Sequence, residues 1–263
     1  MKVTFAFLDP KVASSRLRAG IPQKELARHG VGLGRDILVY GKHVLPRGIV
    51  EQYKKSVYDI CDDHFHTDHE KYYREHAAFA DLITVNSEEM ARIVKEETWR
   101  NPVVIPDPYE SEEQEAGYGK GVLWFGHQSN LKTVEPYYDI VTNILTAQDW
   151  SREAQLKAIH ECGIVVIPTS DKKGKSANRL IEAVRNGRFV VAGELPAHEE
   201  FKQFMWIGDI REGISWAASH KSECISRVKD CQDYIRDRFS PETIGQMWYA
   251  TIKEVFHGNN FIR

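Results

Sequence analysis

Short apolar runs recur along the chain, separated by stretches with helical or loop character. They occupy residues 3–8, 36–40, 57–61, 82–85, 103–105, 122–125, 164–167, 189–191 and 204–207, with a weaker run at 139–144. Apolar runs of this length, bounded by polar segments, are typical of buried strands, and their alternation with helices predicts βα units on parallel sheets. The pattern therefore predicts an α/β fold.

Helix start signals follow several of these runs. Ser87 can cap a helix whose apolar residues recur three and four positions apart, and a second helix is predicted over residues 151–161. The Ser-Pro-Glu sequence at 240–242 combines a cap, a proline and an acid, and it predicts a last helix to about residue 256. The glycine-rich stretch 30–34 precedes a strand, the wrong order for a dinucleotide-binding turn, so we interpret it as a simple turn.

An acidic, glycine-rich stretch at residues 110–121 has no apolar period. Such a composition is typical of a linker. It predicts a boundary between an N-terminal domain, residues 1–112, and a second domain, residues 113–240, followed by a C-terminal helix within 241–263.

Composition and charge limit the classes of partner. The 263 residues carry a formal net charge of -3, so a nucleic-acid partner would need a local basic patch. The apolar runs are far shorter than the roughly 20 residues that span a bilayer, and the N-terminal residues show no signal-peptide pattern. The four cysteines are scattered without paired spacing. These features predict a cytoplasmic protein without a transmembrane segment.

The segment with the clearest chemistry begins at the apolar run 164–167, which breaks at a proline and opens into a lysine-rich loop and a helix. We expect Ser176 to cap this helix and Gly187 to end it in the left-handed conformation. Its apolar stripe is formed by Ala177, Leu180, Ile181 and Val184.

The start of this helix is a candidate anion site. Unpaired backbone N–H groups and the positive end of the helix dipole, reinforced by Lys173, Lys175 and Arg179, would bind a phosphate or diphosphate. The alternative is a solvated basic loop. Glu182 shares a helix face with Asn178, and its carboxylate could accept hydrogen bonds from a ribose diol.

The stretch 175–192 resembles the donor-binding helix and the following strand of GT-B glycosyltransferases of the retaining family 4 type, also called glycosyl transferases group 1. In that family a glutamate followed by alanine holds the nucleotide ribose, and Glu182 occupies its place. The resemblance implies a donor site that includes Lys175, Ser176, Asn178, Arg179 and Glu182.

Three further segments resemble the same family. Residues 14–18 look like its N-terminal donor and acceptor loop, and residues 80–87 with 104–106 resemble a conserved stretch of its first lobe. Residues 124–126, opening to Lys132, match the spacing of its phosphate loop. The resemblance adds Gly126, His127 and Lys132 to the donor site, and it makes acceptor or sugar contacts of Ser14, Ser15, Arg16 and Arg18.

The sequence departs from the family pattern at two positions. His127 stands where the phosphate-loop arginine is expected, which leaves Lys132 as the matched cation. Gly174 stands where a first glutamate, eight residues before Glu182, contacts the donor sugar. The chain is also a short variant, with little room between Lys132 and Ser151 for the customary elements.

A cluster of acids and histidines at residues 62–69 follows the predicted strand 57–61, at the edge where open α/β sheets carry functional loops. Three interpretations remain open: a divalent metal site, a contact to a sugar hydroxyl or acceptor, and a polar loop before a helix. On the resemblance we expect acceptor-side contacts, with His64 or Asp63 in a catalytic position and Asp62 beside the sugar.

Taken together, the resemblance implies two facing Rossmann-like lobes (GT-B) with a C-terminal helix crossing back to the first lobe. It implies a hexosyl- or pentosyltransferase that takes a UDP- or GDP-sugar donor and retains configuration, without a required cofactor or metal. The groups expected to act in catalysis are His64, Asp63, Lys132 and Lys175. The acceptor is a glycan, a lipid-linked chain or another hydroxyl compound, with a modified DNA base the least favoured. The alternative is a catalytically degenerate GT-B protein that binds a nucleotide or a glycan.

Overall fold

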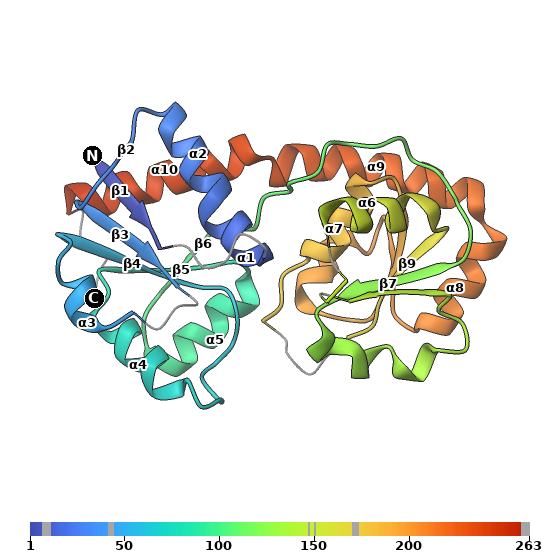
Figure 1. The fold of residues 1–263 in the computed structure, drawn as a ribbon, viewed down its shortest axis with the longest axis horizontal. Helices are drawn as coiled ribbons and strands as arrows, with labels where there is room; N and C mark the ends of the chain where they lie inside the picture. The colour runs from blue at the N-terminus through green and yellow to red at the C-terminus, as the bar shows by residue number, and fades with distance from the viewer. Residues whose placement is uncertain (7–11, 42–44, 147, 150, 170–173, 259–263) are drawn as a thin grey trace. The chain divides into compact units, whose positions relative to one another are not determined.

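The computed structural model describes residues 1–6, 12–41, 45–146, 148–149, 151–169 and 174–258. The chain divides into two compact units, each built on one parallel sheet (Figure 1). Unit 1 consists of the described residues within 1–110, 174–176 and 238–263, and unit 2 of those within 111–173 and 177–237.

Unit 1 contains a sheet in the order β2-β1-β3-β4-β5-β6, and every pairing in it is parallel. The register places Val39 opposite both Phe5 and Val57. The strands are β1 (Lys2–Phe5), β2 (Gly32–Leu33), β3 (Ile37–Tyr40), β4 (Lys55–Ile60), β5 (Leu82–Val85) and β6 (Val103–Val104).

Helices cover both faces of this sheet because alternate residues of each strand point to opposite faces. One face packs Ile37, Val39 and Val57 with the apolar residues of α2 (Ile21–Arg28) and α10 (Pro241–His257). The other face packs its side chains on α4 (Glu70–Phe79) and α5 (Glu88–Thr98). Figure 1 shows these two helices on the same side of the sheet. Short elements complete the unit: α1 (Ala13–Ser15), the π-helix η1 (Arg16–Gly20) and α3 (Arg47–Val50).

Unit 2 contains a sheet in the order β11-β10-β9-β7-β8, again parallel throughout. Its two central strands, β9 and β10, are buried along their whole length. The strands are β7 (Val122–Gly126), β8 (Asn143–Thr146), β9 (Ile164–Ile167), β10 (Phe189–Ala192) and β11 (Trp206–Ile207). The helices are η2 (Gln128–Thr133), η3 (Glu135–Tyr137), α6 (Arg152–Glu161), α7 (Asn178–Arg185), η4 (Pro196–Phe201), α8 (Ile210–Ser219) and α9 (Lys221–Phe239), the last of which ends in unit 1.

The apolar runs correspond to strands in both sheets, so the predicted α/β class is confirmed. The weaker run at 139–144 was placed too early, because β8 begins at Asn143. The stretch 30–34, interpreted as a turn, contains the two-residue edge strand β2. The predicted caps at Ser87 and Ser240 are confirmed, since each side chain accepts a backbone N–H of its helix, and Ser151 caps the predicted helix α6 in the same way.

The stretch 110–121 is more ordered than its composition indicated. The division between the units falls after Glu110, and the residues beyond it pack along unit 2. The backbone N–H groups of Gln114 and Gly117 donate to the carbonyls of Arg185 and Gly187, at 2.8 and 3.0 Å. Backbone and side-chain partners elsewhere in unit 2 thus hold this part of the chain in place.

Candidate functional site

The start of α7 presents backbone donors at the carboxyl edge of the second sheet. The helix begins at Asn178, and its N-cap residue Ala177 provides no side-chain hydrogen bond. The predicted cap at Ser176 is wrong, because the helix starts one residue too late for that side chain to serve as N-cap. The first N–H groups of an α-helix have no intrahelical partner, so this end can accept an anionic ligand. The predicted end at Gly187 is confirmed, with a φ of 75°.

Arg179, in the first turn of α7, extends to the end of β7. Its Nη1 donates to the carbonyl of Phe125 at 3.3 Å. A Cβ atom built on Gly126 would lie 3.3 Å from the same nitrogen, so a glycine allows the guanidinium to approach the strand closely. Within the described part of the chain, no carboxylate forms an ion pair with Arg179. The side chain is half-buried.

This arrangement perturbs two neighbouring groups. Burial lowers the pKa of Arg179 to about 10, because desolvation disfavours the charged guanidinium. Burial also lowers the pKa of His198, and the positive charge of Arg179 lowers it further. His198 Nδ1 lies 2.9 Å from the Gly193 carbonyl, so this nitrogen carries the proton and donates it. Among the described residues, Arg179 therefore brings a positive charge to this site without an ion-pair partner.

The loop after β7 places the two other predicted phosphate contacts at the surface. His127 is the N-cap of η2, and its Nδ1 accepts a hydrogen bond from the backbone N–H of Ser129 at 3.2 Å. Lys132 is exposed on the same short helix. The imidazole of His127 thus caps its own helix, whereas the guanidinium of Arg179 contacts the end of β7.

Glu182, one turn beyond Asn178, is buried within a polar network of unit 2. Its Oε1 accepts from Arg152 at 2.7 Å and from Asn186 at 3.3 Å, and it also accepts from the hydroxyl of Ser111. Only 10% of the Glu182 side chain is exposed. The sequence placed this carboxylate on a solvated helix face, and the structure places it in a network that a ribose diol would have to join or rearrange.

Lys175 lies in unit 1, where its ammonium forms an ion pair with Asp62 at 2.9 Å. Lys175, predicted to contact the donor, is thus paired with Asp62, predicted to contact the acceptor or sugar. The neighbouring Gly174 is buried against α5, and a Cβ atom there would lie 2.6 Å from Met90 Cε. A glutamate at position 174 would require this packing to change. Lys173, the third predicted cation, lies outside the described residues.

The acid and histidine cluster after β4 forms a compact turn. Asp63 Oδ1 accepts the backbone N–H of Phe65 at 3.0 Å, and the ring of His64 packs on Tyr73 with centroids 5.1 Å apart. In the part of the chain that the structure describes, no three His, Cys, Asp or Glu side chains converge as a metal site would require. His64 and Asp63 stay predictions as catalytic groups.

Arg18, predicted to contact the acceptor, is buried at the carboxyl edge of the first sheet. Its guanidinium donates to Asp59 at 2.6 and 3.0 Å, to Asp107 at 3.2 Å, and to the carbonyl of Ile105. Burial opposes the charge, but the two carboxylates raise the pKa of Arg18. Arg16 pairs with Glu110 through two hydrogen bonds of 2.8 Å. Both arginines thus have structural partners.

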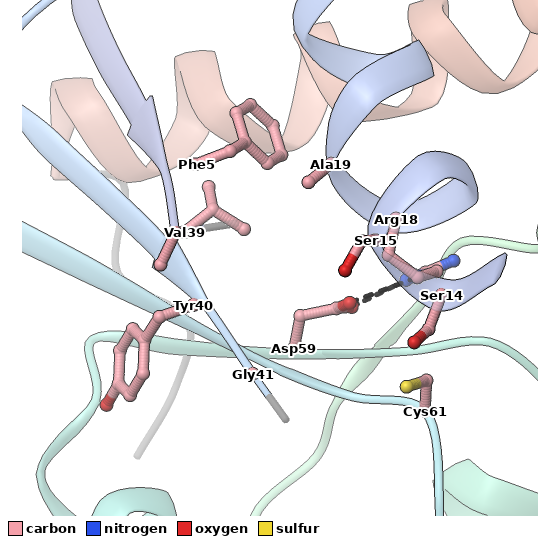
Figure 2. A pocket seen from close by; sticks show the side chains of 11 residues that line it. Phe5, Ser14, Ser15, Arg18, Ala19, Val39, Tyr40, Gly41, Asp59 and Cys61 are labelled. Carbon is pink, nitrogen blue, oxygen red and sulfur yellow. Dashed lines mark hydrogen bonds and ion pairs between the residues drawn. The ribbon is translucent and has the colours of Figure 1, made fainter. Parts of the chain in front are cut away.

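A small pocket lies beside Arg18 (Figure 2). Its volume is about 40 Å³, and residues at the ends of β1, β3 and β4 line it together with the turn at Ser14 and Ser15. The hydroxyl oxygens of Ser14 and Ser15 are both buried and have no hydrogen-bond partner among the described residues. Ser14 and Ser15, both predicted to contact the acceptor, thus line the same pocket.

Several members of these sites had no sequence signal. Asp59 and Asp107 lie 41 and 89 residues from Arg18 along the chain, and Arg152 lies outside any recognisable motif. For Asp59 alone the sequence offered a signal, because this residue is polar and lies inside the apolar run of β4.

Comparisons with known proteins identify the fold. No protein-family model matches the chain, and no curated protein matches it in sequence. Solved structures do. HepE from Anabaena, in complex with UDP and glucose, matches with a TM-score of 0.64 and 15% identity, over 95% of this chain and 85% of that one.

Two more structures illustrate the same likeness. A TarM variant from S. aureus, in complex with fondaparinux, α-GlcNAc-glycerol and UDP, has a TM-score of 0.63 and 14% identity over 84% of this chain. This chain spans 55% of the length of that TarM chain. A UDP-forming α,α-trehalose-phosphate synthase from Burkholderia vietnamiensis has a TM-score of 0.60 and 9% identity, over 95% of this chain and 79% of that one. The two Rossmann-like units of this protein thus have the GT-B fold. No helix within the described ranges is long and apolar enough to span a membrane.

Proposed function

We propose that the protein is a glycosyltransferase that moves a sugar from a UDP-sugar to a hydroxyl acceptor. The observation that carries this proposal is Arg179, a half-buried guanidinium beside an uncapped helix N-terminus at the carboxyl edge of the second sheet. Open α/β sheets bind their ligands at this edge. A donor diphosphate would supply the counter-charge that no described carboxylate gives to Arg179.

The choice of UDP rests on the neighbours in fold. HepE and TarM were crystallised with UDP, and the trehalose-phosphate synthase is UDP-forming. A trehalose-6-phosphate synthase of the same fold is described in terms of glycosyl transfer with retention. We extend both properties, the uridine nucleotide and the retained configuration, to this protein as part of the proposal.

Arg179 has the chemistry that bond cleavage requires. Negative charge grows on the diphosphate as the bond between the sugar and the phosphate breaks, and preorganised donors in a water-poor site stabilise that charge. Arg179 and the first N–H groups of α7 are such donors. We assign to Arg179 the part that the family resemblance gave to the arginine missing at His127.

The remaining predicted groups take supporting parts in this proposal. Lys132, Ser176 and Asn178 assist donor binding, Glu182 accepts from the ribose, and Lys175 exchanges Asp62 for a donor phosphate. His64, Asp63 and Asp62 contact the acceptor sugar. Transfer of a hexosyl rather than a pentosyl group follows the glucose of the HepE complex.

The test is calorimetric titration of UDP, UDP-glucose and GDP-mannose against the wild type, Arg179→Ala and Arg211→Ala. Arg211 is the matched control, because it pairs with Asp139 on the exposed surface of unit 2. A lost charge-assisted hydrogen bond weakens binding by about 1.5–3 kcal/mol, so we expect Arg179→Ala to reduce UDP affinity about 10- to 100-fold. Equal affinity of Arg179→Ala and Arg211→Ala would contradict the proposal.

Turnover separates an enzyme from a binding module. Release of UDP from UDP-glucose, with or without added acceptor, is expected for the wild type and not for Arg179→Ala. Tight UDP binding with no release of UDP under any acceptor condition would favour the catalytically degenerate alternative.

A further inference from the structure

His198 is a buried titratable group at the carboxyl edge of the second sheet, and the proposed reaction gives it no part. It lies on η4, shortly after the end of β10, and is 2% exposed. Its Nδ1 donates to the Gly193 carbonyl at 2.9 Å. Gly193 approaches Thr169 so closely that a Cβ atom on the glycine would lie 2.7 Å from the threonine side chain. The imidazole is thus fixed on the segment that follows β10, beside the segment that follows β9.

Arg179 and His198 approach the second sheet from opposite sides of β9. The order β10-β9-β7 places β9 between the other two strands. Arg179 donates to the Phe125 carbonyl on β7, whereas His198 donates to the Gly193 carbonyl after β10. Two strand spacings separate these carbonyls, on the order of 10 Å. The chain leads from β9 to α7 between them. A diphosphate bound by Arg179 and the first N–H groups of α7 would therefore also lie near His198.

The positive charge of Arg179 acts on His198 in the free protein. Burial has the largest effect and lowers the pKa of His198, and Arg179 lowers it further. Among the described residues, no other charged side chain shifts the pKa of His198. The remaining charged or titratable side chains on η4 and the segments beside it are Glu194, Glu199, Glu200, Lys202, Cys231 and Tyr234. The imidazole is therefore neutral at pH 7 as long as Arg179 is without an anion.

A bound diphosphate would reverse the charge that His198 experiences. In the free protein this charge is the single positive charge of Arg179. A diphosphate that is esterified at both ends brings two negative charges, so the sum beside His198 changes from positive to negative. A nearby negative charge favours the protonated form of an imidazole, whereas a positive charge disfavours it.

We propose that His198 takes up a proton when a diphosphate binds at Arg179, so that a second positive charge faces the leaving diphosphate only while the donor is bound. The proton comes from the solvent and returns to it when the nucleotide leaves. That the diphosphate belongs to a sugar donor rests on the proposed function, whereas the coupling rests on the placement of Arg179 and His198 within unit 2. We assign to His198 the part of a positioning residue, which acts through Arg179 and the local charge without touching the donor.

Calorimetric titration of UDP-glucose in buffers with different enthalpies of ionisation counts the protons taken up on binding. Both phosphates of UDP-glucose are esterified, so the ligand itself does not titrate near neutral pH as UDP does. The proteins are the wild type, His198→Asn and the control His220→Asn. Asparagine keeps an N–H donor for the Gly193 carbonyl, and His220 places its Nδ1 2.8 Å from the Trp216 carbonyl in the same way but is exposed. At pH 6.5 we expect the wild type and the control to take up a measurable fraction of a proton, and His198→Asn close to none.

The same coupling predicts a pH dependence of affinity. One proton taken up per ligand raises the affinity about tenfold for each unit by which the pH falls, and a fraction of a proton raises it less. Between pH 7.5 and 6 we therefore expect UDP-glucose to bind about three- to tenfold more tightly to the wild type and to His220→Asn. The affinity of His198→Asn should stay nearly constant over this range.

Arg179→Met tests the coupling without a ligand and with His198 in place. Removing the positive charge removes one of the two causes that lower the pKa of His198. The imidazole of the free variant should therefore titrate at a higher pH than that of the wild type, as followed by NMR of the ring nitrogens. This measurement decides the inference even where His198→Asn does not fold.

The outcomes separate this inference from the proposed function. Equal proton counts in the wild type and His198→Asn, or a titration of His198 that Arg179→Met does not move, would overturn the inference and leave the donor site standing. A protein that does not bind UDP-glucose would contradict the proposed function. Inorganic pyrophosphate is then the probe, and a larger proton uptake by the wild type than by His198→Asn would support the inference without a nucleotide. Absence of binding to both probes would overturn the two together.

Discussion

Arg18 in unit 1 and Arg179 in unit 2 occupy comparable places, each at the carboxyl edge of a parallel sheet, and their surroundings differ sharply. Arg18 donates to two carboxylates and a carbonyl, whereas Arg179 donates to one carbonyl at 3.3 Å. The pKa of Arg18 is raised by its partners and that of Arg179 is lowered to about 10 by burial. The guanidinium of Arg18 thus has carboxylate partners, whereas that of Arg179 has none among the described residues.

This difference teaches how to recognise a ligand-binding cation among structural ones. A buried charge with its counter-charge is stable without a ligand, and removing one partner exposes the cost of burying the other. A buried charge without a counter-charge has a cost that only a ligand removes. The two arginines should therefore respond in opposite ways to substitution.

The largest expected effect is that of Arg18→Ala. The substitution leaves the carboxylates of Asp59 and Asp107 buried without their cation, so the free energy of unfolding should fall by about 3–5 kcal/mol. Urea denaturation measures this change. Arg16→Ala is the control, because its partly exposed pair with Glu110 should contribute less than about 1 kcal/mol. Similar losses in the two variants would remove the distinction between a buried and a surface pair.

The second prediction concerns His76, which is a buried histidine of unit 1 as His198 is of unit 2. Burial lowers the pKa of His76 to about 4 from its ordinary value near 6.5, so the folded protein keeps it neutral while the unfolded chain takes up a proton below pH 6.5. The contribution of neutral His76 to the free energy of unfolding is fully present above pH 6.5 and is lost as the pH falls toward 4. Between pH 7 and 4.5 we expect a loss of about 2 kcal/mol in the free energy of unfolding.

The variant His76→Gln separates the pH dependence that comes from His76 from the pH dependence that comes from the carboxylates. Its unfolding free energy should fall less than that of the wild type over the same pH range. Parallel pH profiles would show that folding does not lower the pKa of His76. The ring nitrogen Nδ1 lies 3.0 Å from the Tyr40 hydroxyl, which the amide of glutamine can also reach.

A smaller effect of opposite sign is expected for Arg179→Met. Methionine keeps the apolar stem and removes the uncompensated charge, so the free energy of unfolding without ligand should rise by about 1 kcal/mol. Denaturation of wild type and variant, each with and without UDP, measures both states. A loss of stability comparable with that of Arg18→Ala would mean that Arg179 is a structural residue.

The smallest expected effect concerns Trp99, the C-cap of α5. It adopts a left-handed conformation with a φ of 59°, and 91% of its surface is exposed. Glycine adopts this conformation without the steric cost of a side chain, so Trp99→Gly should raise the free energy of unfolding by about 0.5–1 kcal/mol. Thermal denaturation measures the shift, with Trp99→Ala as the control that keeps the cost. An unchanged or lower melting temperature for the glycine variant would show that the indole contributes to packing.

The sequence predicted the parts of the fold that depend on local pattern. The strands 82–85 and 164–167 were located to the residue because both are buried on two faces and read as continuous apolar runs. Strand β2 escaped notice because its two residues are exposed at a sheet edge and include a glycine. The start of α7 was misplaced because Ser176 carries a good capping side chain but lies in a segment that packs with unit 1.

For the candidate sites, the sequence predicted which residues take part but not which partners they have. Arg18 and Arg179 look alike in the sequence, since each follows a strand and begins or precedes a helix. Their partners come from distant segments, and no local rule places Asp107 beside Arg18 or the Phe125 carbonyl beside Arg179. The same limit explains Glu182, which local spacing put on a solvated face and tertiary packing put in a network with Ser111 and Arg152.

The packing of α10 has a consequence for the order in which the chain folds during synthesis. Ile244, Trp248 and Ile252 belong to the same apolar core as Val3 and Phe5. That core cannot close until α10 has left the ribosome, whereas unit 2 is almost continuous between residues 111 and 237. Domains generally fold as units during translation, and contacts distant in sequence form late. Unit 2 is therefore expected to fold first, with the first half of unit 1 waiting for its last helix.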